Sequence, residues 1–270
     1  MKYSFQHKRV LVTGGASGIG KIMARLALEK GAADLVLWDI NPQGLAQTQT
    51  ELAPIGGKVH TYTVDVSKLE EVQAAAQQTL SDVGPIDVLI NNAGIIVGKN
   101  FHEHSHADIQ RTMQINSAAL MHITLEFLPG MMSRNSGAIC NIASQAALVS
   151  NPRMSVYCAS KWAAFGWSDS LRLEMQQLKK NVGVTTIAPY YINTGMFEGV
   201  KSPVIPILDP EKTSAKIMRA IEHRRAVLAL PMPYWFVRFF QAILPLTVYD
   251  WVMEHLLGIY KSMEEFKGRR

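Results

Sequence analysis

The sequence contains little cysteine, since Cys140 and Cys158 are the only two in 270 residues. Two cysteines in apolar contexts cannot form the disulfide framework of a small secreted domain, so we expect reduced core thiols and a cytoplasmic protein. The sequence also lacks any uncharged run near the roughly 18 residues that a membrane-spanning helix requires. No apolar signal segment precedes the first predicted strand, and we therefore expect neither secretion nor a membrane span.

The excess of charge is small as well, because 27 lysines and arginines face 22 acidic residues and give a formal net charge of +5. No basic run is interleaved with aromatic side chains, so we do not expect a nucleic-acid partner. Apolar residues make up 48% of the chain and charged residues 18%, which is typical of a globular protein with a full core.

Short apolar segments alternate regularly with amphipathic ones along the chain. Strands are predicted at residues 10–13, 35–39, 59–64, 86–90, 138–142, 182–187 and 226–230. Helices are predicted at residues 21–30, 42–52, 69–82, 106–133, 152–179 and 210–223, with Asn41 and Ser67 as caps of the second and third. Seven strands separated by helices predict an α/β fold, a doubly wound parallel sheet covered on both faces.

No linker or change in composition divides this pattern, so residues 1–232 are expected to form one domain. Within it, the glycine- and proline-rich residues 190–210 are predicted to be a loop or lid. Residues 233–270 then form a helical extension that Pro245 and Gly258 interrupt. Its aromatic side chains are Trp235, Phe236, Phe239, Phe240, Trp251 and Tyr260.

A glycine-rich turn joins the first predicted strand to the first helix. Glycines at this place let the backbone approach a pyrophosphate, and the N–H groups of the helix face its charge. Gly14, Gly18 and Gly20 have the spacing Gly-x-x-x-Gly-x-Gly directly after Thr13. We expect the cofactor contacts of this turn to come from Gly14, Ala16, Ser17, Gly18, Ile19 and Gly20.

Polar residues follow the next strands at the same expected edge of the sheet. Asp39 ends the second strand, where a carboxylate accepts a hydrogen bond from a ribose 2′-hydroxyl and repels a 2′-phosphate. Ser17 and Ile40 add no positive charge there, so the sequence favours NAD over NADP. Further cofactor contacts are expected from Asp65 and Val66, which could flank the adenine, and from Asn92, Ala93 and Gly94 at the next ribose.

A hydroxyl, a phenol and an ammonium form the candidate catalytic group. Tyr157 and Lys161 are four residues apart on a predicted helix, which places both side chains on one face. A nearby ammonium favours the phenolate and lowers the pKa of a phenol, as a general base requires. Ser144, at the end of an apolar strand, can hold a substrate oxygen. A Tyr-x-x-x-Lys spacing is weak evidence alone, because an ordinary surface helix also produces it.

Together these motifs resemble the short-chain dehydrogenase/reductase family, whose pattern they follow in order from residue 8 to about 230. The matching positions are Thr13, Gly14, Gly18, Gly20, Asp65, Asn91 to Gly94, Asn116, Ser144, Tyr157, Lys161, Pro189 and Thr194. The resemblance implies a Rossmann fold, with Tyr157 as general acid/base and Lys161 lowering its pKa and holding the nicotinamide ribose. It also implies that Asn116 holds a water of a proton relay. Pro189, Ile192 and Thr194 are expected at the nicotinamide.

One departure from the family pattern narrows the resemblance. Tyr190 stands where the family usually has glycine, and with Tyr191 and the residues around Thr194 it is similar to the branch of retinol dehydrogenases and 17-beta-hydroxysteroid dehydrogenases. Members of that branch often have an N-terminal membrane anchor, which is not expected here. The family usually forms dimers or tetramers through the helices at 106–133 and 152–179, so a homodimer or homotetramer is expected.

The residues expected around the substrate are mostly apolar and none is charged, which favours a hydrophobic alcohol or carbonyl compound. They are Ile95, Ile96, Ala146, Val149, Met154, Tyr190, Tyr191, Met196 and Phe197. The aromatic extension could cover the cleft, contact another subunit or lie on a lipid surface; a lid or subunit contact is favoured over peripheral membrane contact. His102, His104 and His106 alternate at a loop, where they do not converge, so no metal site is expected.

Two classes of function remain. The favoured one is an oxidoreductase that transfers a hydride between NAD(H) and a hydrophobic alcohol, ketone or aldehyde, with Tyr157 transferring the proton. The alternative is a non-catalytic NAD-binding scaffold or redox sensor that acts through its C-terminal extension. The complete set of Ser144, Tyr157 and Lys161 favours the enzyme, because a scaffold has no need of it.

Overall fold

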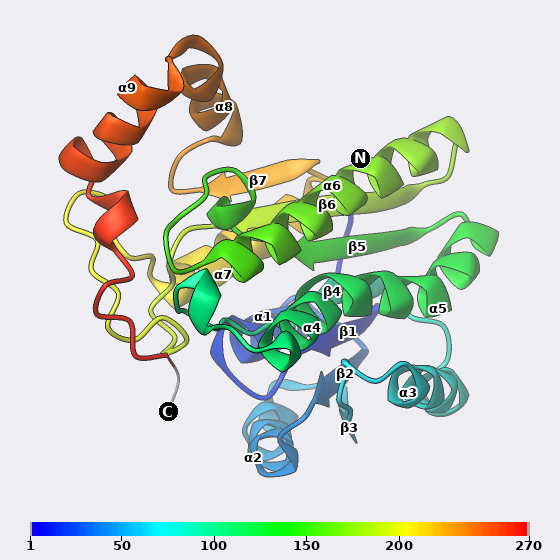
Figure 1. Cartoon of the computed structure of the whole chain (residues 1–270). Coiled ribbons are helices and arrows are strands. Elements are labelled where there is room, and N and C mark those ends of the chain that lie inside the picture. The colour runs from blue at the N-terminus through cyan, green and yellow to red at the C-terminus, as the bar shows by residue number, and fades with distance from the viewer. Residues whose placement is uncertain (1, 269–270) are drawn as a thin grey trace.

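A computed structural model describes residues 2–268. Seven parallel strands form one sheet in the order β3-β2-β1-β4-β5-β6-β7 (Figure 1). The predicted doubly wound α/β architecture, a Rossmann fold, is confirmed. The strands are β1 (Arg9–Thr13), β2 (Asp34–Asp39), β3 (Lys58–Thr63), β4 (Val88–Asn91), β5 (Gly137–Ile142), β6 (Val182–Pro189) and β7 (Val227–Leu230).

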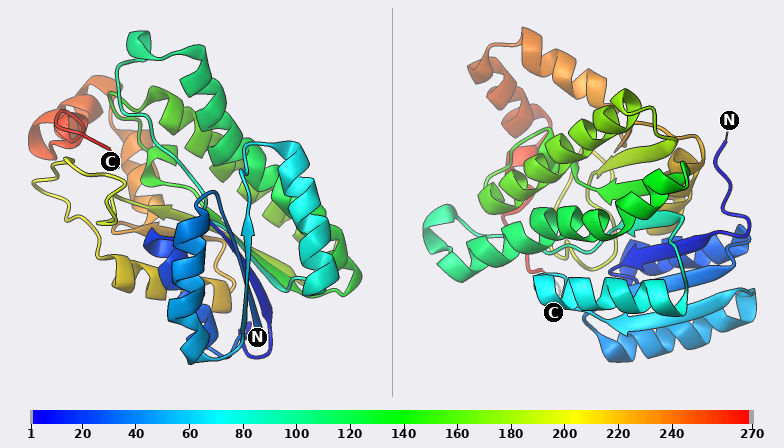
Figure 2. Two further views of the ribbon diagram at one scale, coloured as in Figure 1. Left: turned by 90° about the horizontal axis from the view of Figure 1, so that it is seen from below. Right: turned by 90° about the vertical axis from the view of Figure 1, so that its right-hand side faces the viewer.

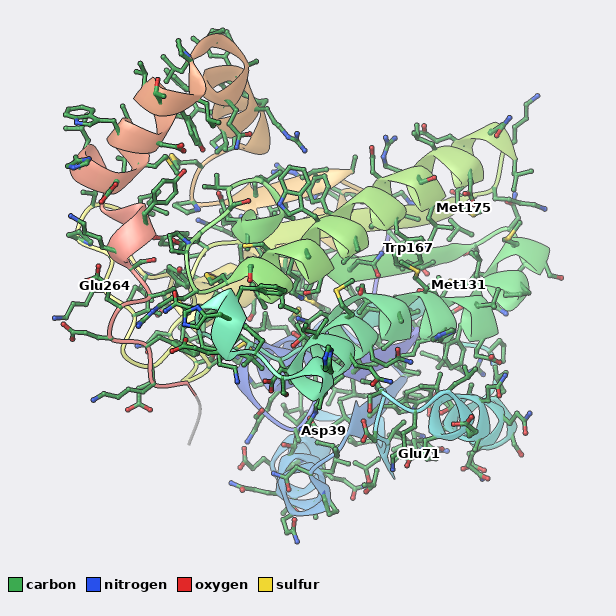
Figure 3. The ribbon with its side chains drawn as sticks, in the orientation of Figure 1. Asp39, Glu71, Met131, Trp167, Met175 and Glu264 are labelled. Atoms are coloured by element: carbon green, nitrogen blue, oxygen red, sulfur yellow. The ribbon has the colours of Figure 1, made fainter. Side chains whose placement is uncertain are left out.

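Helices cover both faces of the sheet (Figure 2). One layer contains α1 (Gly18–Glu29), α2 (Pro42–Leu52) and α7 (Pro210–Glu222), and the other contains α3 (Leu69–Asp82), α4 (His106–Met113), α5 (Ala119–Ser133) and α6 (Ser155–Gln177). Alternate residues of β1 supply both cores, since Val10 and Val12 pack with Met23 of α1 while Leu11 packs on the opposite face. Met131, Trp167 and Met175 belong to that second core, between the helices and the sheet (Figure 3).

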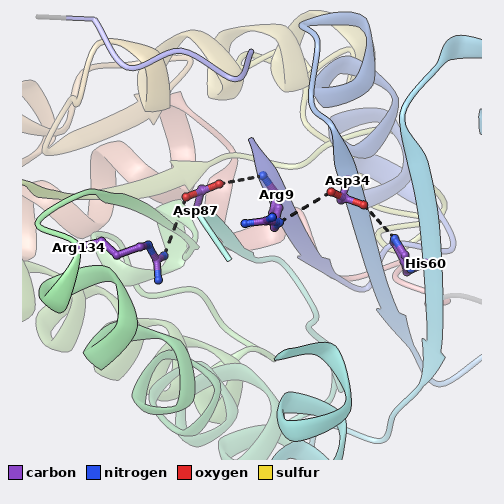
Figure 4. Close-up of polar contacts among 5 residues, drawn as sticks. All are labelled: Arg9, Asp34, His60, Asp87 and Arg134. Atoms are coloured by element: carbon purple, nitrogen blue, oxygen red, sulfur yellow. Dashed lines mark hydrogen bonds and ion pairs between the residues drawn. The ribbon is translucent and has the colours of Figure 1, made fainter. Parts of the chain in front are cut away.

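Charged residues connect the strands at the edge where they begin (Figure 4). Asp87, before β4, accepts a hydrogen bond from the backbone N–H of Arg9 at 3.1 Å. Asp34 lies 3.9 Å from the Arg9 guanidinium and 3.1 Å from the His60 ring nitrogen. These contacts connect the first four strands at the edge opposite the one where they end. The polar residues of the candidate site lie at the other edge, where the strands end.

The structure corrects two predicted details of the helices. The expected helix at 106–133 is divided by a π-helical turn, Gln114–Ala118, between α4 and α5. Ser67 does not cap α3, because its N–H and its hydroxyl both donate to Asp65 at 3.0 and 2.7 Å. Asn41 does cap α2, since its side chain accepts from the N–H of Gly44 at 3.1 Å.

The chain after β7 forms a helical extension. It contains α8 (Tyr234–Ile243), α9 (Leu246–Trp251), a π-helical turn (Val252–Leu256) and a short 3₁₀ helix (Ile259–Lys261). Pro245 precedes α9 and Gly258 adopts φ 62°, so both interruptions lie where they were predicted. Figure 1 shows α8 and α9 beside one another beyond the β7 edge of the sheet. The domain boundary at residue 232 stays a prediction, and Arg269 and Arg270 lie outside the described residues.

None of the helices in residues 2–268 is both long and apolar enough to cross a membrane.

Candidate active site

A cleft of about 290 Å³ lies at the carboxyl ends of the strands. The strand order reverses between β1 and β4, and ligands of open α/β sheets bind at such a switch point. The cleft receives the glycine-rich turn after β1, the ends of β2 and β4, and part of α6. The predicted cofactor residues that line it are Gly14, Ser17, Gly18, Ile19, Asp39, Asp65, Val66, Asn92, Ala93, Gly94, Tyr157, Lys161, Pro189, Ile192 and Thr194.

The glycines of the turn serve different purposes. Gly14 and Gly18 have φ values of 65° and 56°, which other residues adopt only with strain. A Cβ atom on Gly18 would lie 3.6 Å from the Cβ of Thr194, so Gly18 faces that residue across the cleft. A Cβ atom on Gly20 would lie only 2.1 Å from the carbonyl oxygen of Gly14. Gly20 therefore allows the turn to pack closely on α1, but it does not itself line the cleft.

The turn is fastened to the end of β4. The Thr13 hydroxyl accepts hydrogen bonds from the N–H groups of Asn92 and Ala93, both at 3.0 Å. The Asn92 amide donates to the carbonyl oxygens of Thr13 at 2.9 Å and Gly14 at 3.2 Å. These bonds hold the cleft open in a fixed shape, as a pre-formed dinucleotide site requires.

Asp39 lines the cleft at the end of β2, and its carboxylate is oriented by two backbone groups. The N–H of Ala16 donates to Asp39 Oδ2 and the N–H of Asn41 donates to Oδ1, both at 3.0 Å. Ala16 thus lies behind the turn and not among the residues that line the cleft. A carboxylate fixed in this place suits the ribose hydroxyls of a dinucleotide.

Asp65 also lines the cleft, together with Arg111, which none of the sequence motifs includes. Burial disfavours the charged form of Asp65, but hydrogen bonds from Ser67 outweigh it and hold the pKa of the carboxyl below its ordinary value. Arg111 of α4 also lines the cleft, and its charge acts on Asp65 in the same direction. Ile115, one helical turn later, lines the cleft too. In the sequence, only the four-residue spacing of Arg111 and Ile115 indicates that both lie on one side of a helix.

Ser144, Tyr157 and Lys161 meet on the other side of the cleft, and each is less than a tenth exposed. The Lys161 ammonium donates to the carbonyl oxygen of Ile142 at 2.9 Å and lies 5.8 Å from the centre of the Tyr157 ring. The Ser144 hydroxyl accepts from the N–H of Ala146 at 3.1 Å. The structure therefore brings the predicted phenol, ammonium and hydroxyl together.

The direction of the phenol's pKa shift is the reverse of the prediction. Burial raises the pKa of Tyr157, and the interaction with the Ser144 hydroxyl only partly opposes that effect. Burial also lowers the pKa of Lys161 to about 8. Both groups lose solvation on the same wall of the cleft, so the neutral form of each is favoured before any ligand contributes.

Asn116 lies in the π-helical turn and is fully buried, outside the lining of the cleft. Its Oδ1 accepts from the N–H of Ile95 at 2.9 Å, and its Nδ2 donates to the Ile95 carbonyl at 2.9 Å and to Ser160 Oγ at 3.0 Å. A Cβ atom on Gly94 would lie 3.2 Å from Asn116 Oδ1 and 3.6 Å from Lys161 Nζ. The absence of that atom leaves space between the two side chains, while the proton relay through Asn116 stays a prediction.

A second cavity of about 310 Å³ adjoins the cleft, and both are lined by Ser144, Tyr190 and Phe197. Six of the nine predicted substrate residues line it: Ala146, Val149, Met154, Tyr190, Tyr191 and Phe197. Ile95 and Met196 line the first cleft instead, and Ile96 packs beside Tyr157. The motifs did not predict which residues of the extension line this second cavity; they include Phe236, Val237, Phe240, Leu244, Tyr249 and Met253.

The loop after β6 is joined to the extension by a buried polar cluster. The Tyr191 hydroxyl lies 2.9 Å from Ser262 Oγ and accepts from the Asn151 amide at 3.0 Å. The N–H of Lys267 donates to the carbonyl of Glu198 at 2.9 Å. The extension therefore covers the second cavity with one side of its helices.

His102 lies in a short 3₁₀ helix (Phe101–Glu103), His104 directly follows it, and His106 is the first residue of α4. Within the described residues, no three or more histidine, cysteine, aspartate or glutamate side chains gather in a way that could hold a metal ion.

Comparisons with known proteins agree with this geometry. The family model described as "short chain dehydrogenase" matches residues 8–204. Mouse (Mus musculus) epidermal retinol dehydrogenase 2 is 37% identical over 266 residues, which cover 97% of this chain and 85% of that protein. Estradiol 17-beta-dehydrogenase 11 of Pongo abelii is 35% identical over 237 residues, covering 87% and 79%. A short-chain dehydrogenase/reductase from Burkholderia phymatum, crystallised with NAD, has a TM-score of 0.80 and 27% identity, covering 89% of this chain and 95% of that one.

Proposed function

Because the chain belongs to the short-chain dehydrogenase/reductase family of oxidoreductases, we propose that it transfers a hydride between NAD(H) and a hydrophobic alcohol, or the matching ketone or aldehyde. The observation that carries the proposal is the junction of the two cavities. The dinucleotide-shaped cleft and the apolar cavity share Ser144, and Tyr157 lies beside it. An alcohol in the apolar cavity can thus present its oxygen to both hydroxyls.

The residues of the cleft fit a nicotinamide dinucleotide. Gly18 leaves room for it at the start of α1, whose N–H groups suit the pyrophosphate, and the B. phymatum structure of the same fold holds NAD. When bound, the nicotinamide accepts or supplies the hydride. The Asp39 carboxylate and the neutral Ile40 favour NAD over NADP, because a 2′-phosphate would face a negative charge there.

Tyr157 holds the proton that the substrate oxygen loses or gains. In alcohol oxidation its phenolate oxygen takes the hydroxyl proton, and in carbonyl reduction its hydroxyl donates that proton. The Ser144 hydroxyl, oriented by the Ala146 backbone, holds the same oxygen. Lys161, when charged, favours the phenolate of Tyr157, because its ammonium lies 5.8 Å from the centre of the Tyr157 ring.

The second cavity supports a hydrophobic substrate. Its lining is mostly aliphatic and aromatic, with Met154, Phe197, Phe236 and Phe240 among the larger side chains. The names of two relatives, a retinol dehydrogenase and an estradiol dehydrogenase, refer to apolar alcohols. We therefore propose a retinoid, a steroid or a long-chain alcohol as the substrate class.

A panel of these alcohols with NAD and NADP in parallel tests the proposal by absorbance at the reduced-nicotinamide band. We expect turnover with NAD to exceed that with NADP by roughly tenfold or more, and oxidation to accelerate as the pH rises towards the raised pKa of Tyr157. Tyr157→Phe should lower turnover by about 10²–10⁴-fold while NAD binding, followed by calorimetry, stays nearly unchanged.

Tyr62→Phe is the matched control, because the Tyr62 hydroxyl bonds Asp82 outside the cleft. Full activity of the Tyr157→Phe protein would refute the proton-transfer role, and a preference for NADP would refute the role of Asp39. Tight NAD binding by a wild-type protein that oxidises no alcohol of the panel would favour the scaffold or redox sensor instead.

A further inference from the structure

Helix α8 is apolar around most of its circumference, although only one side of it contacts the other described parts of the chain. Val237 is buried. Phe236 and Phe240 line the second cavity, here called the substrate cavity because the proposed function places the substrate there, and both remain more than a third exposed. A second set of apolar side chains does not line the cavity and continues onto α9 and the π-helical turn after it. This set, here called the outer face, consists of Trp235, Phe239, Ile243, Leu246, Trp251 and Leu256, each more than half exposed.

A helix that is apolar all round is normally covered on all sides. Among residues 2–268, no other segment covers the outer face, and it stands beyond the β7 edge of the sheet (Figure 1). Its rings on α8 pack against rings that line the cavity, with centroids of Trp235 and Phe236 at 6.2 Å and of Phe239 and Phe240 at 5.6 Å. Contiguous exposed apolar surface of this kind marks an interaction site.

The polar side chains of α8 between Trp235 and Ile243 are already engaged inside the chain. The Arg238 guanidinium lies 5.3 Å from the centre of the Trp162 ring on α6, and the Gln241 amide donates to the Leu148 carbonyl at 2.6 Å. Protein interfaces contain about one hydrogen bond per 100–200 Å². The outer face therefore offers few polar groups that could orient a protein partner. A lipid surface needs no such bonds, and indoles such as Trp235 and Trp251 suit its boundary with water.

The position of the substrate cavity points in the same direction. Phe236, Phe240 and Leu244 line the cavity and also border the outer face along α8. Apolar surface is therefore continuous from the outer face into the cavity. A hydrophobic substrate dissolved in lipid could pass along this surface without crossing water.

We propose that the outer face of α8 and α9 docks on a lipid surface, with the substrate cavity opening towards the lipid. Between Trp235 and Leu257 the charged side chains are Arg238, Asp250 and Glu254, one positive and two negative. Attachment is therefore apolar and not electrostatic, and it does not depend on anionic lipid. The route of substrate entry rests on the proposed function, whereas the docking itself does not.

Flotation of the full chain with phosphatidylcholine vesicles, without substrate, measures docking separately from turnover. We expect the wild-type protein to float equally well with and without added phosphatidylserine, and at low and high salt. The combined substitutions Trp235→Ser, Phe239→Ser and Trp251→Ser should reduce the bound fraction by about tenfold or more, because each removes apolar area that docking would bury in the lipid. The matched control carries Ile55→Ser, Leu80→Ser and Leu178→Ser, at exposed apolar positions elsewhere, and should float normally.

A second measurement follows tryptophan fluorescence. Phosphatidylcholine brominated in its acyl chains should quench the fluorescence of Trp235 and Trp251. The double variant Trp235→Phe with Trp251→Phe should lose this quenching while it still floats. Absence of wild-type flotation would overturn the proposal, and loss of a dimer by the serine variant would then identify the outer face as a subunit contact. Binding that requires phosphatidylserine and disappears at high salt would overturn it as well, because basic residues elsewhere would then hold the protein.

Discussion

Lys161 is held where an ammonium is unfavourable on its own. Its side chain is 4% exposed, and its hydrogen bond goes to a neutral acceptor, the carbonyl oxygen of Ile142. Burial disfavours the charged form and lowers the pKa of Lys161 from 10.5 to about 8. The fold thus retains a group that lowers its stability, and such retention is typical of functional sites.

Lys161→Met should therefore stabilise the protein at neutral pH while lowering its activity. Below pH 8 the wild-type lysine is charged in both the folded and the unfolded chain, so the folded state carries the full cost of burying the charge. The cost is roughly 3 kcal/mol, less about 1 kcal/mol for the lost hydrogen bond. The advantage of the variant should shrink as the pH rises from about 8 to 10.5, where only the unfolded chain still holds the proton.

Thermal and denaturant unfolding of both proteins across this pH range measures the difference. Lys216→Met on α7 is the control, because Lys216 is exposed and its replacement should change stability by no more than about 0.5 kcal/mol. A difference between wild type and Lys161→Met that is constant with pH would contradict the prediction, since it would show that the charge of Lys161 is not what destabilises the fold.

At the scale of elements, the π-helical turn Gln114–Ala118 has the clearest consequence. A π turn adds one residue to a helix and often occurs at functional sites. Here Arg111 of α4 and Ile115 of the turn line the cleft, while Asn116 of the turn bonds the backbone of Ile95. The periodicity of residues 106–133 predicted one helix, because apolar residues recur with a helical spacing on both sides of the turn.

Asn116→Ala should destabilise the chain by about 2–4 kcal/mol, because it leaves the partly buried N–H and C=O of Ile95 and the buried hydroxyl of Ser160 without this partner. Ser117→Ala is the matched control in the same turn, and it should cost only about 1 kcal/mol for the single bond to Met113. Urea unfolding monitored by circular dichroism gives both values. Equal losses for the two variants would contradict the anchoring role of Asn116.

Elements and motifs differ in how far the sequence could predict them. Strands and glycine turns depend on residues close together in the sequence. The alternation of apolar segments therefore predicted the sheet, and the glycine spacing with Asp39 at a strand end predicted that Gly14, Gly18 and Asp39 share one cleft. Ser67 was assigned as a cap wrongly, because a nearby carboxylate, Asp65, competes for its hydroxyl. The direction of the Tyr157 pKa shift was wrong because desolvation depends on tertiary burial, which a four-residue spacing does not contain.

At the scale of the whole molecule, the walls of the substrate cavity come from distant parts of the chain. Ser144 follows β5, Tyr190 follows β6, and Phe240 belongs to α8. The sequence predicted the first two, since they follow strand ends, but contacts of the extension depend on how α8 and α9 fold back. The resemblance to retinol and 17-beta-hydroxysteroid dehydrogenases is confirmed by the relatives, whereas the substrate itself stays a proposal.

The two helical layers of the molecule differ in what they expose. Leu125 on α5 is 65% exposed and Leu173 on α6 is 51% exposed, and both helices belong to the same layer (Figure 2). The family resemblance implies that these two helices form the contact between subunits. Exposed leucines there suit a self-complementary interface, in which each residue is buried twice in a dimer. This layer is distinct from the outer face of α8 and α9, so subunit contact and lipid docking can coexist.

Leu125→Glu with Leu173→Glu should convert the expected dimer or tetramer into smaller species. Each dimer would bury four carboxylates without partners, and burying an unpaired charge is strongly unfavourable. Sedimentation velocity without lipid measures the change, and the outer-face serine variant should keep the wild-type mass. If the glutamate variant also keeps that mass, α5 and α6 are not the interface. If the serine variant alone loses mass, the outer face is the interface, and the lipid proposal is refuted with it.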